Sequence, residues 1–360
     1  MTNSDLYIDE LDRNFYESMQ HVQAAYKKMY PRGVFYSNII VNKLIDNETS
    51  CSGYGLTFSG GVDSTYSLIS NLEKKPTLIM YLGADINLDA KKDIKDVKDR
   101  YLDFSRKLGL ELHFIESYGL QNIDEDRVSH AFHNVLGGTF WEYLMHGLFN
   151  ASNTAPFSVG RFRTLLMASS DPEPGLSRKY GSSPEVDGLI KWADKDVRQD
   201  SVILRQKKAA ELCKSSLRGH LNLRVCTHQI SENCCSCEKC YRTMLSLLVS
   251  GNDPNEYGFR INRQTFENMK RFLTMVKIRR SSIADTYVPI QSEMIRQKRK
   301  PDVDGYTEFY EWFENLNLED ITDSGVLIRE LYYSVPFPIS EPLYKLAKKM
   351  KLDIIKQALK

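Results

Sequence analysis

Short apolar runs alternate with longer amphipathic segments between residues 51 and 250. Each apolar run ends at glycine, proline or polar residues, as buried strands do, whereas the longer segments repeat apolar side chains every three or four residues, as helices do. Strands are predicted at residues 55–59, 76–83, 111–117, 163–170, 196–200 and 221–226. Helices are predicted at residues 63–72, 89–109, 127–150 and 238–251. This alternation predicts an α/β fold with a parallel sheet covered on both faces.

Both ends of the chain have a different pattern. Residues 10–29 place apolar side chains on one helical face, which predicts a helical N-terminal extension over residues 1–50. Residues 251–360 lack a buried strand run and are rich in charge and helix formers, which predicts a helical C-terminal region. The basic runs at 277–280 and 296–300 lie in this region, and such runs usually form a solvated helix face. We therefore expect three parts, with the α/β domain in the middle.

The composition is that of a globular protein. Hydrophobic residues make up 42% of the 360 residues, which is enough for a large core. A net charge of +1 gives no general reason to expect binding to nucleic acid or membrane. The N-terminus is acidic, and no apolar run approaches the roughly 18 residues that a membrane span requires. We expect a cytoplasmic protein without a signal peptide.

The sequence Ser-Gly-Gly-Val-Asp-Ser, residues 59–64, lies between the first of these strands and its helix. Glycines there let backbone N–H groups approach an anion, and the positive end of the helix favours negative charge. Ser59 and Ser64 add hydroxyl donors, whereas Asp63 suits phosphate only if Mg²⁺ lies between them. The pattern predicts a phosphate-binding loop, and the rival interpretation is an ordinary turn. The loop is not a Walker loop, because no Gly-Lys-Ser/Thr follows.

Five of the seven cysteines lie within fifteen residues. Such clustering, with an odd total and no secretion signal, indicates metal binding and not a disulfide framework. The predicted zinc ligands, spaced Cys-x₇-Cys-x₂-Cys-x₂-Cys, are Cys226, Cys234, Cys237 and Cys240. A closed four-thiolate site has a structural role. The alternatives are that His220 or His228 replaces one cysteine, that no metal binds, or that the extra Cys235 is a catalytic thiol.

Residues 59–64 match the signature Ser-Gly-Gly-x-Asp-Ser, and the chain resembles the PP-loop ATP pyrophosphatase family. Its members split ATP between the α and β phosphates and transfer AMP to a carboxylate or carbonyl oxygen, after which a nitrogen or sulfur nucleophile displaces AMP. With the cysteine spacing, the chain is similar to 7-cyano-7-deazaguanine synthase and its relatives over about residues 51–250. The resemblance implies an adenine nucleotide α hydrolase-like fold with ATP, Mg²⁺ and Zn²⁺.

The resemblance also implies a nucleotide site. Its catalytic residues would be Asp63, Ser59 and Ser64. The predicted nucleotide-binding residues are Ser59, Gly60, Gly61, Val62, Asp63, Ser64, Gly83, Asp85, Ser169 and Arg242. Gly83 and Asp85 end the strand where this family holds adenosine, and Ser169 ends the strand at 163–170, where a plain turn is the rival interpretation. Further candidates are Arg205 and Lys208 for phosphate, and Tyr180, Ser182, Ser183, Glu185 and Asp187 for the substrate.

The leading hypothesis is an ATP-dependent ligase that adenylates a carboxylate or carbonyl oxygen and amidates it with ammonia or an amine. Residues 180–187 replace the Tyr-Pro-Asp-Cys-Arg stretch of the synthase, which favours a different small-molecule acid. The alternative is a sulfur transferase acting on tRNA or a small molecule, which needs Cys51, Cys213 or Cys235 as a reactive thiol. A third hypothesis is a non-catalytic nucleotide-binding module. We expect no membrane partner, regard nucleic acid as the weaker expectation, and leave open a homodimer or larger assembly.

Overall fold

The chain divides into two compact units, which we call unit 1 and unit 2. Unit 1 comprises Met1–Ser59 and Ser67–Ile203, and unit 2 comprises Gly60–Tyr66 and Leu204–Lys360. These units do not follow the expected boundaries at residues 50 and 250. The computed structural model describes residues 4–33, 37–170, 179–276, 278–279, 282–298, 300–323, 333, 335–342, 345–346 and 349.

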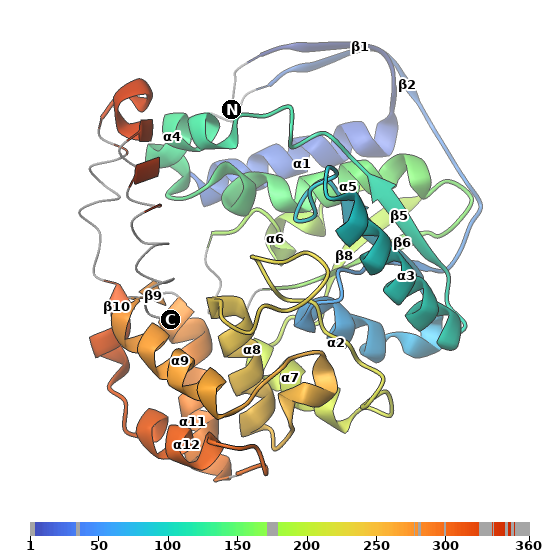
Figure 1. The fold of residues 1–360 in the computed structure, drawn as a ribbon. Helices are drawn as coiled ribbons and strands as arrows, with labels where there is room; N and C mark the ends of the chain where they lie inside the picture. Colours follow the sequence, from blue (N-terminus) through green and yellow to red (C-terminus); the bar gives the residue numbers. More distant parts are fainter. Residues whose placement is uncertain are drawn as a thin grey trace. The chain divides into compact units, whose positions relative to one another are not determined.

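Unit 1 is built on a six-stranded sheet with the order β5–β4–β3–β6–β8–β7 (Figure 1). Every neighbouring pair is parallel except β7 and β8. The strands are β3 (Tyr54–Thr57), β4 (Thr77–Leu82), β5 (Leu112–Glu116), β6 (Thr164–Ala168), β7 (Lys191–Trp192) and β8 (Lys195–Asp200). The predicted α/β fold with a mainly parallel sheet is therefore confirmed.

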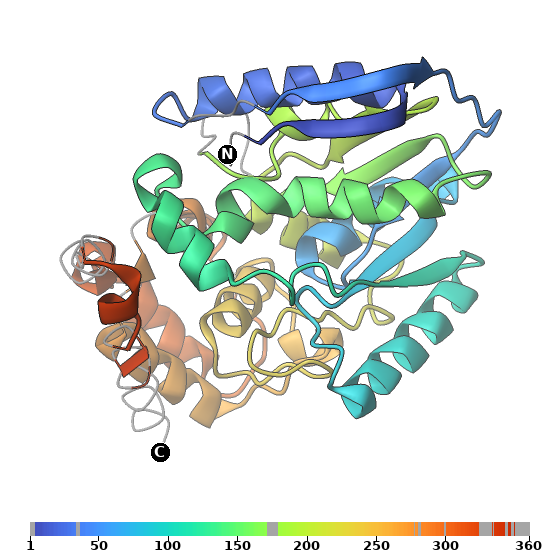
Figure 2. The ribbon, with the colours of Figure 1, turned by 90° about the horizontal axis from the view of Figure 1, so that it is seen from above.

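Helices cover both faces of this sheet (Figure 2). On one face, Tyr26, Leu144 and Val186 share a hydrophobic core with Leu165 and Val197 of the sheet. On the other face, the ring of Phe58 packs against that of Tyr101, with centroids 5.4 Å apart. The helices of unit 1 are α1 (Arg13–Met29), α3 (Lys91–Lys107), α4 (Glu125–Leu136), α5 (His146–Phe157) and α6 (Pro184–Asp187). Burial on both faces explains why the central strands are almost continuously apolar.

The N-terminal segment is not purely helical, which corrects the expectation for residues 1–50. Strand β1 (Leu6–Asp12) precedes α1 in the chain and strand β2 (Ile39–Ile45) follows it. The two strands pair with each other in parallel. Both strands are largely exposed, and polar side chains link them across the pair, as Lys43 Nζ does with Glu10 Oε1 at 2.8 Å. Because such strands carry no buried apolar alternation, the sequence pattern did not reveal them.

Unit 2 is mainly helical over its described residues. Its helices are α7 (Arg205–Lys214), α8 (Glu238–Val249), α9 (Arg263–Met275), α11 (Val288–Gln297) and α12 (Tyr306–Glu314). Two short strands, β9 (Ile278–Arg279) and β10 (Thr322–Asp323), also pair in parallel. The described residues after 251 are mostly helical, whereas much of residues 324–360 and parts of both predicted basic runs lie outside the described part of the chain.

Residues 221–226 form no strand, which corrects a second expectation. Leu221 and Leu223 are buried, so the alternating pattern is real, but it anchors an irregular segment. The backbone N–H of Leu223 donates to Tyr257 O, and that of Arg224 donates to Gly60 O. Its hydrogen bonds therefore go to separate parts of unit 2 and not to a neighbouring strand.

Helix α2 (Val62–Ser70) passes from unit 2 into unit 1. Single turns of 3₁₀ or π helix complete the structure, namely η1 (Leu72–Lys74), η2 (Trp141–Met145), η3 (Pro254–Tyr257), η4 (Ile283–Tyr287) and η5 (Leu318–Ile321). None of the described helices is both long enough and apolar enough to span a bilayer.

We predict that Gly83→Ala destabilises the protein more than Gly137→Ala. Both glycines have positive φ, 101° for Gly83 and 79° for Gly137, so both substitutions strain the backbone. A Cβ at Gly83 would also lie 1.9 Å from Ser117 O, whereas one at Gly137 meets nothing within 4 Å. Urea unfolding should show a loss of about 1 kcal/mol for Gly137→Ala and at least about 2 kcal/mol for Gly83→Ala. Equal losses would contradict the close approach to Ser117.

Candidate functional site

The strand order of unit 1 reverses between β3 and β6. From β3 the chain builds β4 and β5 on one side, then returns to add β6 and β8 on the other. In open parallel sheets, ligands bind beyond the carboxyl ends of the strands at such a reversal. Ser59, which is exposed, follows β3, and Ser169, which is fully buried, follows β6. Two predicted site residues therefore stand at the place that the topology favours.

The loop continues into unit 2 with Gly60, whose φ of 76° requires a residue that tolerates left-handed backbone. Gly60 O accepts the N–H of Arg224 at 2.8 Å, which holds the turn in place. Thr65 N–H donates to Gly61 O at 2.9 Å, and the hydroxyl of Ser64 donates to the same oxygen at 3.3 Å. Val62 is only 3% exposed, so it is packed against neighbouring residues.

Asp63 is held by two cations of α7. Its Oδ1 accepts from Lys208 Nζ at 2.9 Å, and its Oδ2 accepts from Arg205 Nη2 at 2.6 Å. The Lys208 side chain is completely buried, and that of Asp63 is 16% exposed. Burial alone would raise the pKa of Asp63, but the charges and hydrogen bonds of Arg205 and Lys208 outweigh it and hold this pKa well below its usual range. Asp63 is therefore ionised at neutral pH.

A third cation, Arg242 of α8, lies within electrostatic reach of this pair. Its burial and the positive charge of Arg205 lower the pKa of Arg242, while Glu238 and Asp63 act in the opposite direction. Arg242 Nη1 reaches Glu238 Oε2 at 3.4 Å. Its buried Nε donates to nothing among the residues that the structure describes. Arg205, Lys208 and Arg242 thus bring three positive charges to this part of unit 2, beside the carboxylates of Asp63 and Glu238.

The remaining predicted nucleotide residues belong to unit 1. Gly83 ends β4 in a tight turn, with its N–H donating to Ile86 O at 2.7 Å, and Asp85 in this turn is exposed. Ser169 N–H donates to Asp200 O at 2.9 Å. Each residue therefore lies at the carboxyl end of its strand, as expected.

Sequence reasoning missed the role of Asp200, the last residue of β8. Its Oδ2 accepts from Ser67 Oγ at 2.5 Å, Asn71 Nδ2 at 3.0 Å and Ser201 Oγ at 2.5 Å. It thereby ties α2 to the end of β8 within unit 1. The only signal in the sequence was an aspartate ending a predicted strand. The pairing of Arg205 and Lys208 with Asp63 was also missed, although both were expected near phosphate.

Within the predicted substrate stretch, Ser182 and Asp187 are buried and Glu185 is exposed. Asp187 Oδ2 accepts from Ser182 Oγ at 2.7 Å and from Gln199 Nε2 at 2.8 Å. Gln199 lies on β8, one residue before Asp200. The stretch thus attaches to the carboxyl end of β8, whereas residues 171–178 before it lie outside the described part of the chain.

The four predicted zinc ligands come together in unit 2. The sulfur atoms of Cys226, Cys234, Cys237 and Cys240 all lie within 4.8 Å of one another. The Sγ atoms of Cys237 and Cys240 are 3.5 Å apart, and those of Cys234 and Cys240 are 4.0 Å apart. Sulfurs bound tetrahedrally to zinc at about 2.3 Å would be separated by about 3.8 Å. The four cysteines can therefore hold a metal ion such as zinc.

Backbone N–H groups surround the sulfur atom of Cys226. The backbone N–H groups of His228 and Gln229 donate to Cys226 Sγ at 3.3 and 3.2 Å. His228 Nδ1 lies 4.0 Å from Cys234 Sγ, beside the sulfur cluster and not within it. Cys235 has a φ of 53°, and its sulfur accepts the Arg260 N–H at 3.2 Å outside the cluster. The four-cysteine set is thus favoured over one that includes a histidine.

No protein-family model, curated protein or solved structure matches the chain.

We predict that the purified protein carries stoichiometric zinc and that Cys240→Ser loses it. Removing a ligand should lower zinc affinity by more than the roughly 10- to 100-fold seen when groups around a ligand are changed. Competition with a chromogenic chelator measures this affinity. Cys235→Ser is the matched control and should retain zinc. If Cys235→Ser loses zinc while Cys240→Ser keeps it, the ligand set is wrong.

We predict that Asp63→Asn destabilises the protein by about 2 kcal/mol or more at neutral pH, because it leaves Arg205 and Lys208 without their anion. The folded pKa of Asp63 lies below the unfolded value of about 3.9, so its stabilisation is fully present above about pH 5. It is lost as pH falls through the folded pKa. Urea unfolding of both proteins should therefore show a difference that shrinks on acidification.

The matched control for this experiment is Asp96→Asn on α3, because Asp96 is exposed. It should change stability by no more than about 0.5 kcal/mol at any pH. A wild-type advantage over Asp63→Asn that stays constant between about pH 6 and pH 3 would contradict the ionised Asp63 described above.

Proposed function

We propose that the chain is an ATP-dependent, AMP-forming ligase that adenylates a carboxylate or carbonyl oxygen and then joins ammonia or an amine to the activated carbon. The observation that carries this proposal is the Ser-Gly-Gly-Val-Asp-Ser loop, with its aspartate set between Arg205 and Lys208. We also propose that the chain is related to the PP-loop ATP pyrophosphatases, and among them to 7-cyano-7-deazaguanine synthase.

The residues of the loop and of α7 suit the phosphates of ATP. Gly60 has the backbone conformation that lets a chain bend closely around an anion, and the first turn of α2 contributes the positive end of its dipole. Arg205, Lys208 and Arg242 bring positive charge to the side of the loop that carries Asp63. This charge would attract a bound polyphosphate.

Asp63 fits Mg²⁺ when phosphate oxygens complete the coordination, because Mg²⁺ is commonly bound by one or two carboxylates together with substrate phosphates. When bound, Mg²⁺ would neutralise negative charge on the departing pyrophosphate. Arg205 and Lys208 hold the Asp63 carboxylate ionised and oriented before any ligand arrives. Their guanidinium and ammonium groups can then turn to phosphate oxygens, which form charge-assisted hydrogen bonds of similar strength.

A zinc ion at the four cysteines would have a structural role, because it would fix the position of residues near this loop without taking part in the reaction. Cys237 precedes α8 and Cys240 lies in its first turn, so a metal held by both fixes where the helix begins. Arg242 lies two residues further along the same helix. A four-thiolate site leaves no open position for a substrate, which favours a structural metal.

The described cysteines favour amidation over sulfur transfer. Burial raises the pKa of Cys213, and burial also raises that of Cys235, so neither is readily a thiolate. Cys51 precedes β3, at the amino end of the strand whose carboxyl end leads to Ser59. None of the three thus combines an activated sulfur with a position at the loop. The acid substrate and the nitrogen source remain open within this proposal.

Incubation with ATP, Mg²⁺, ammonium and a panel of carboxylates that includes the deazaguanine acid tests the proposal. We expect AMP and pyrophosphate whose formation depends on one acid. Arg205→Gln removes a charged donor from the phosphates and should lower the rate by roughly 100-fold or more. Asp63→Ala should abolish turnover. Asp96→Asn, remote from the loop in sequence and exposed, should retain the wild-type rate.

Two results would overturn the proposal. Formation of ADP and phosphate would show that the loop does not direct cleavage between the α and β phosphates. Unchanged turnover in Asp63→Ala would remove the residue on which the proposal depends.

The sulfur-transfer alternative is tested by replacing Cys51, Cys213 and Cys235 together with alanine. We expect AMP formation in the triple variant to stay within about threefold of wild type, since none of these thiols would be a nucleophile in amidation. Loss of turnover, with AMP formed in the wild type only when sulfide or a persulfide donor replaces ammonium, would establish the alternative instead.

A further inference from the structure

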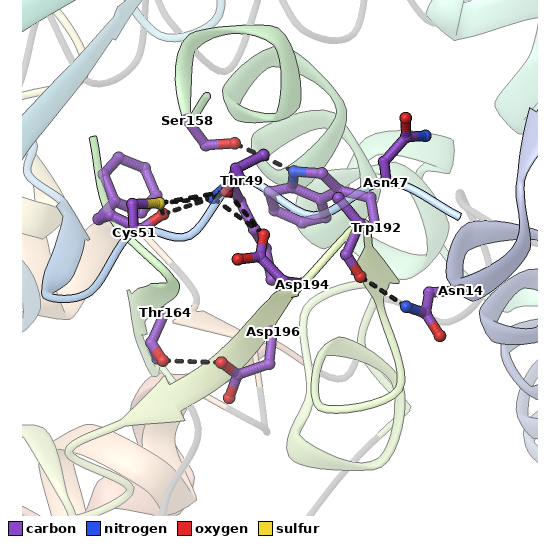
Figure 3. Close-up of polar contacts among 12 residues, drawn as sticks. Asn14, Asn47, Thr49, Cys51, Ser158, Thr164, Trp192, Asp194 and Asp196 are labelled. Carbon is purple, nitrogen blue, oxygen red and sulfur yellow. Dashed lines mark hydrogen bonds and ion pairs between the residues drawn. The ribbon is translucent and has the colours of Figure 1, made fainter. Parts of the chain in front are cut away.

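A second polar cluster lies in unit 1, at the amino ends of β3, β6 and β8 (Figure 3). It joins Thr49 and Cys51, which precede β3, to Asp194 and Lys195 at the start of β8. The carbonyl of Phe162, which precedes β6, completes it. Because these strands are parallel, the cluster is at the opposite edge of the sheet from Ser59 and Ser169. The proposed nucleotide chemistry leaves it unexplained.

Lys195 is the centre of this cluster, and its side chain is completely buried. Its Nζ donates to Thr49 Oγ1 at 2.7 Å, to Phe162 O at 2.8 Å and to Cys51 Sγ at 2.9 Å. An ammonium group has three protons, and these three acceptors match them. Lys195 is therefore built into the fold as a charged donor, and the sulfur of Cys51 is one of its acceptors.

The charge of Lys195 needs a nearby anion, because an isolated buried ammonium is costly. The carboxylate of Asp194 is 3.4 Å away, the longest of the four Lys195 contacts, and it also accepts from Thr49 Oγ1 at 2.7 Å. The sulfur of Cys51 lies closer. As a thiol it donates to Phe162 O at 3.1 Å, and as a thiolate it would balance the charge of Lys195 more directly than Asp194 does. Burial raises the pKa of Cys51, but the hydrogen bond and the positive charge of Lys195 lower it overall.

Cys51 differs in this respect from the other cysteines of the chain. Four of them form the metal-binding cluster, and the pKa values of Cys213 and Cys235 are raised by burial. Cys51 is also the one cysteine in the sequence of unit 1, since the other six follow residue 203. No second thiol of its own unit can therefore capture an oxidised Cys51 as a disulfide.

We propose that Cys51 is a modification site, whose thiolate, paired with the Lys195 ammonium, is oxidised by hydroperoxides to a sulfenic acid. The sulfur attacks one oxygen of the peroxide, an S–O bond forms and the O–O bond breaks. Sulfur loses two electrons to the peroxide, and the departing hydroxide or alkoxide takes a proton from solvent. An external thiol reverses the change, first as a mixed disulfide with loss of water, then by thiol exchange.

The test uses the full, zinc-loaded chain with limiting hydrogen peroxide and dimedone, which traps sulfenic acid. Peptide mass spectrometry then locates the adduct, and no ATP is needed. We expect Cys51 to be labelled before every other cysteine. A first adduct on Cys213 or Cys235 would overturn the proposal. A product in which Sγ is bonded directly to Lys195 Nζ would also overturn it, because that product requires an uncharged lysine.

Removing a positive charge and removing a negative charge near Cys51 should change its rate of labelling in opposite directions. Damage to the fold would not produce this opposition. Lys195→Gln should slow labelling of Cys51 roughly threefold to tenfold, because the thiolate loses its cation. Asp194→Asn should speed labelling, because Asp194 raises the pKa of Cys51 by its negative charge. Lys191→Gln, an exposed lysine on β7, is the matched control and should leave the rate unchanged.

Lys195→Gln removes a buried charge and can impair folding, so Thr49→Val provides a second variant. It is close in shape, keeps Lys195 and should also slow labelling. It removes the hydroxyl that donates to Asp194 Oδ1 at 2.7 Å, so more of the negative charge of Asp194 acts on Cys51. Circular dichroism checks that each variant is folded. If Asp194→Asn and Thr49→Val shift the rate in the same direction, or if neither shifts it, charge does not control Cys51 and the proposal is wrong.

Discussion

The carboxylate of Asp63, held between Arg205 and Lys208, joins the glycine loop of unit 2 to α7. Arg242 adds a third positive charge beside Glu238, and burial together with the charge of Arg205 lowers the pKa of Arg242. The loop therefore lies beside several cations before any ligand is present. These charges attract an anion, and Arg205 and Lys208 would turn from Asp63 to reach it.

The cysteine cluster imposes a second constraint on the same unit. Cys226 lies in an irregular segment, and Cys240 lies in the first turn of α8. The backbone of Arg224, two residues before Cys226, donates to Gly60 O. A metal at the four cysteines would therefore hold, at short range, both the segment that supports the glycine turn and the helix that carries Arg242. The four cysteines and the charged loop are thus connected through short segments of unit 2.

Local patterns predicted those features that have a local cause. Leu165 and Met167 belong to an apolar run because β6 is buried on both faces, and the glycine loop and the cysteine spacing are contiguous in sequence. The alternation of Leu221 and Leu223 with polar residues led to a wrong prediction of a strand, because alternate residues can also be buried in an irregular segment. The Asp63–Arg205 and Cys51–Lys195 contacts span 142 and 144 residues, and charged side chains so far apart leave no periodic signal.

The interleaving of the two units along the chain has a consequence for biosynthesis. Residues 60–66 belong with a unit whose remainder begins only at Leu204. At translation rates of about 5–20 residues per second, the 142 residues between Asp63 and Arg205 take roughly 7 to 28 seconds to synthesise. Throughout that interval the nascent chain carries the glycine loop without the cations that hold it. The strands of unit 1 can pair on the ribosome, but the loop acquires its final surroundings only after α7 has emerged.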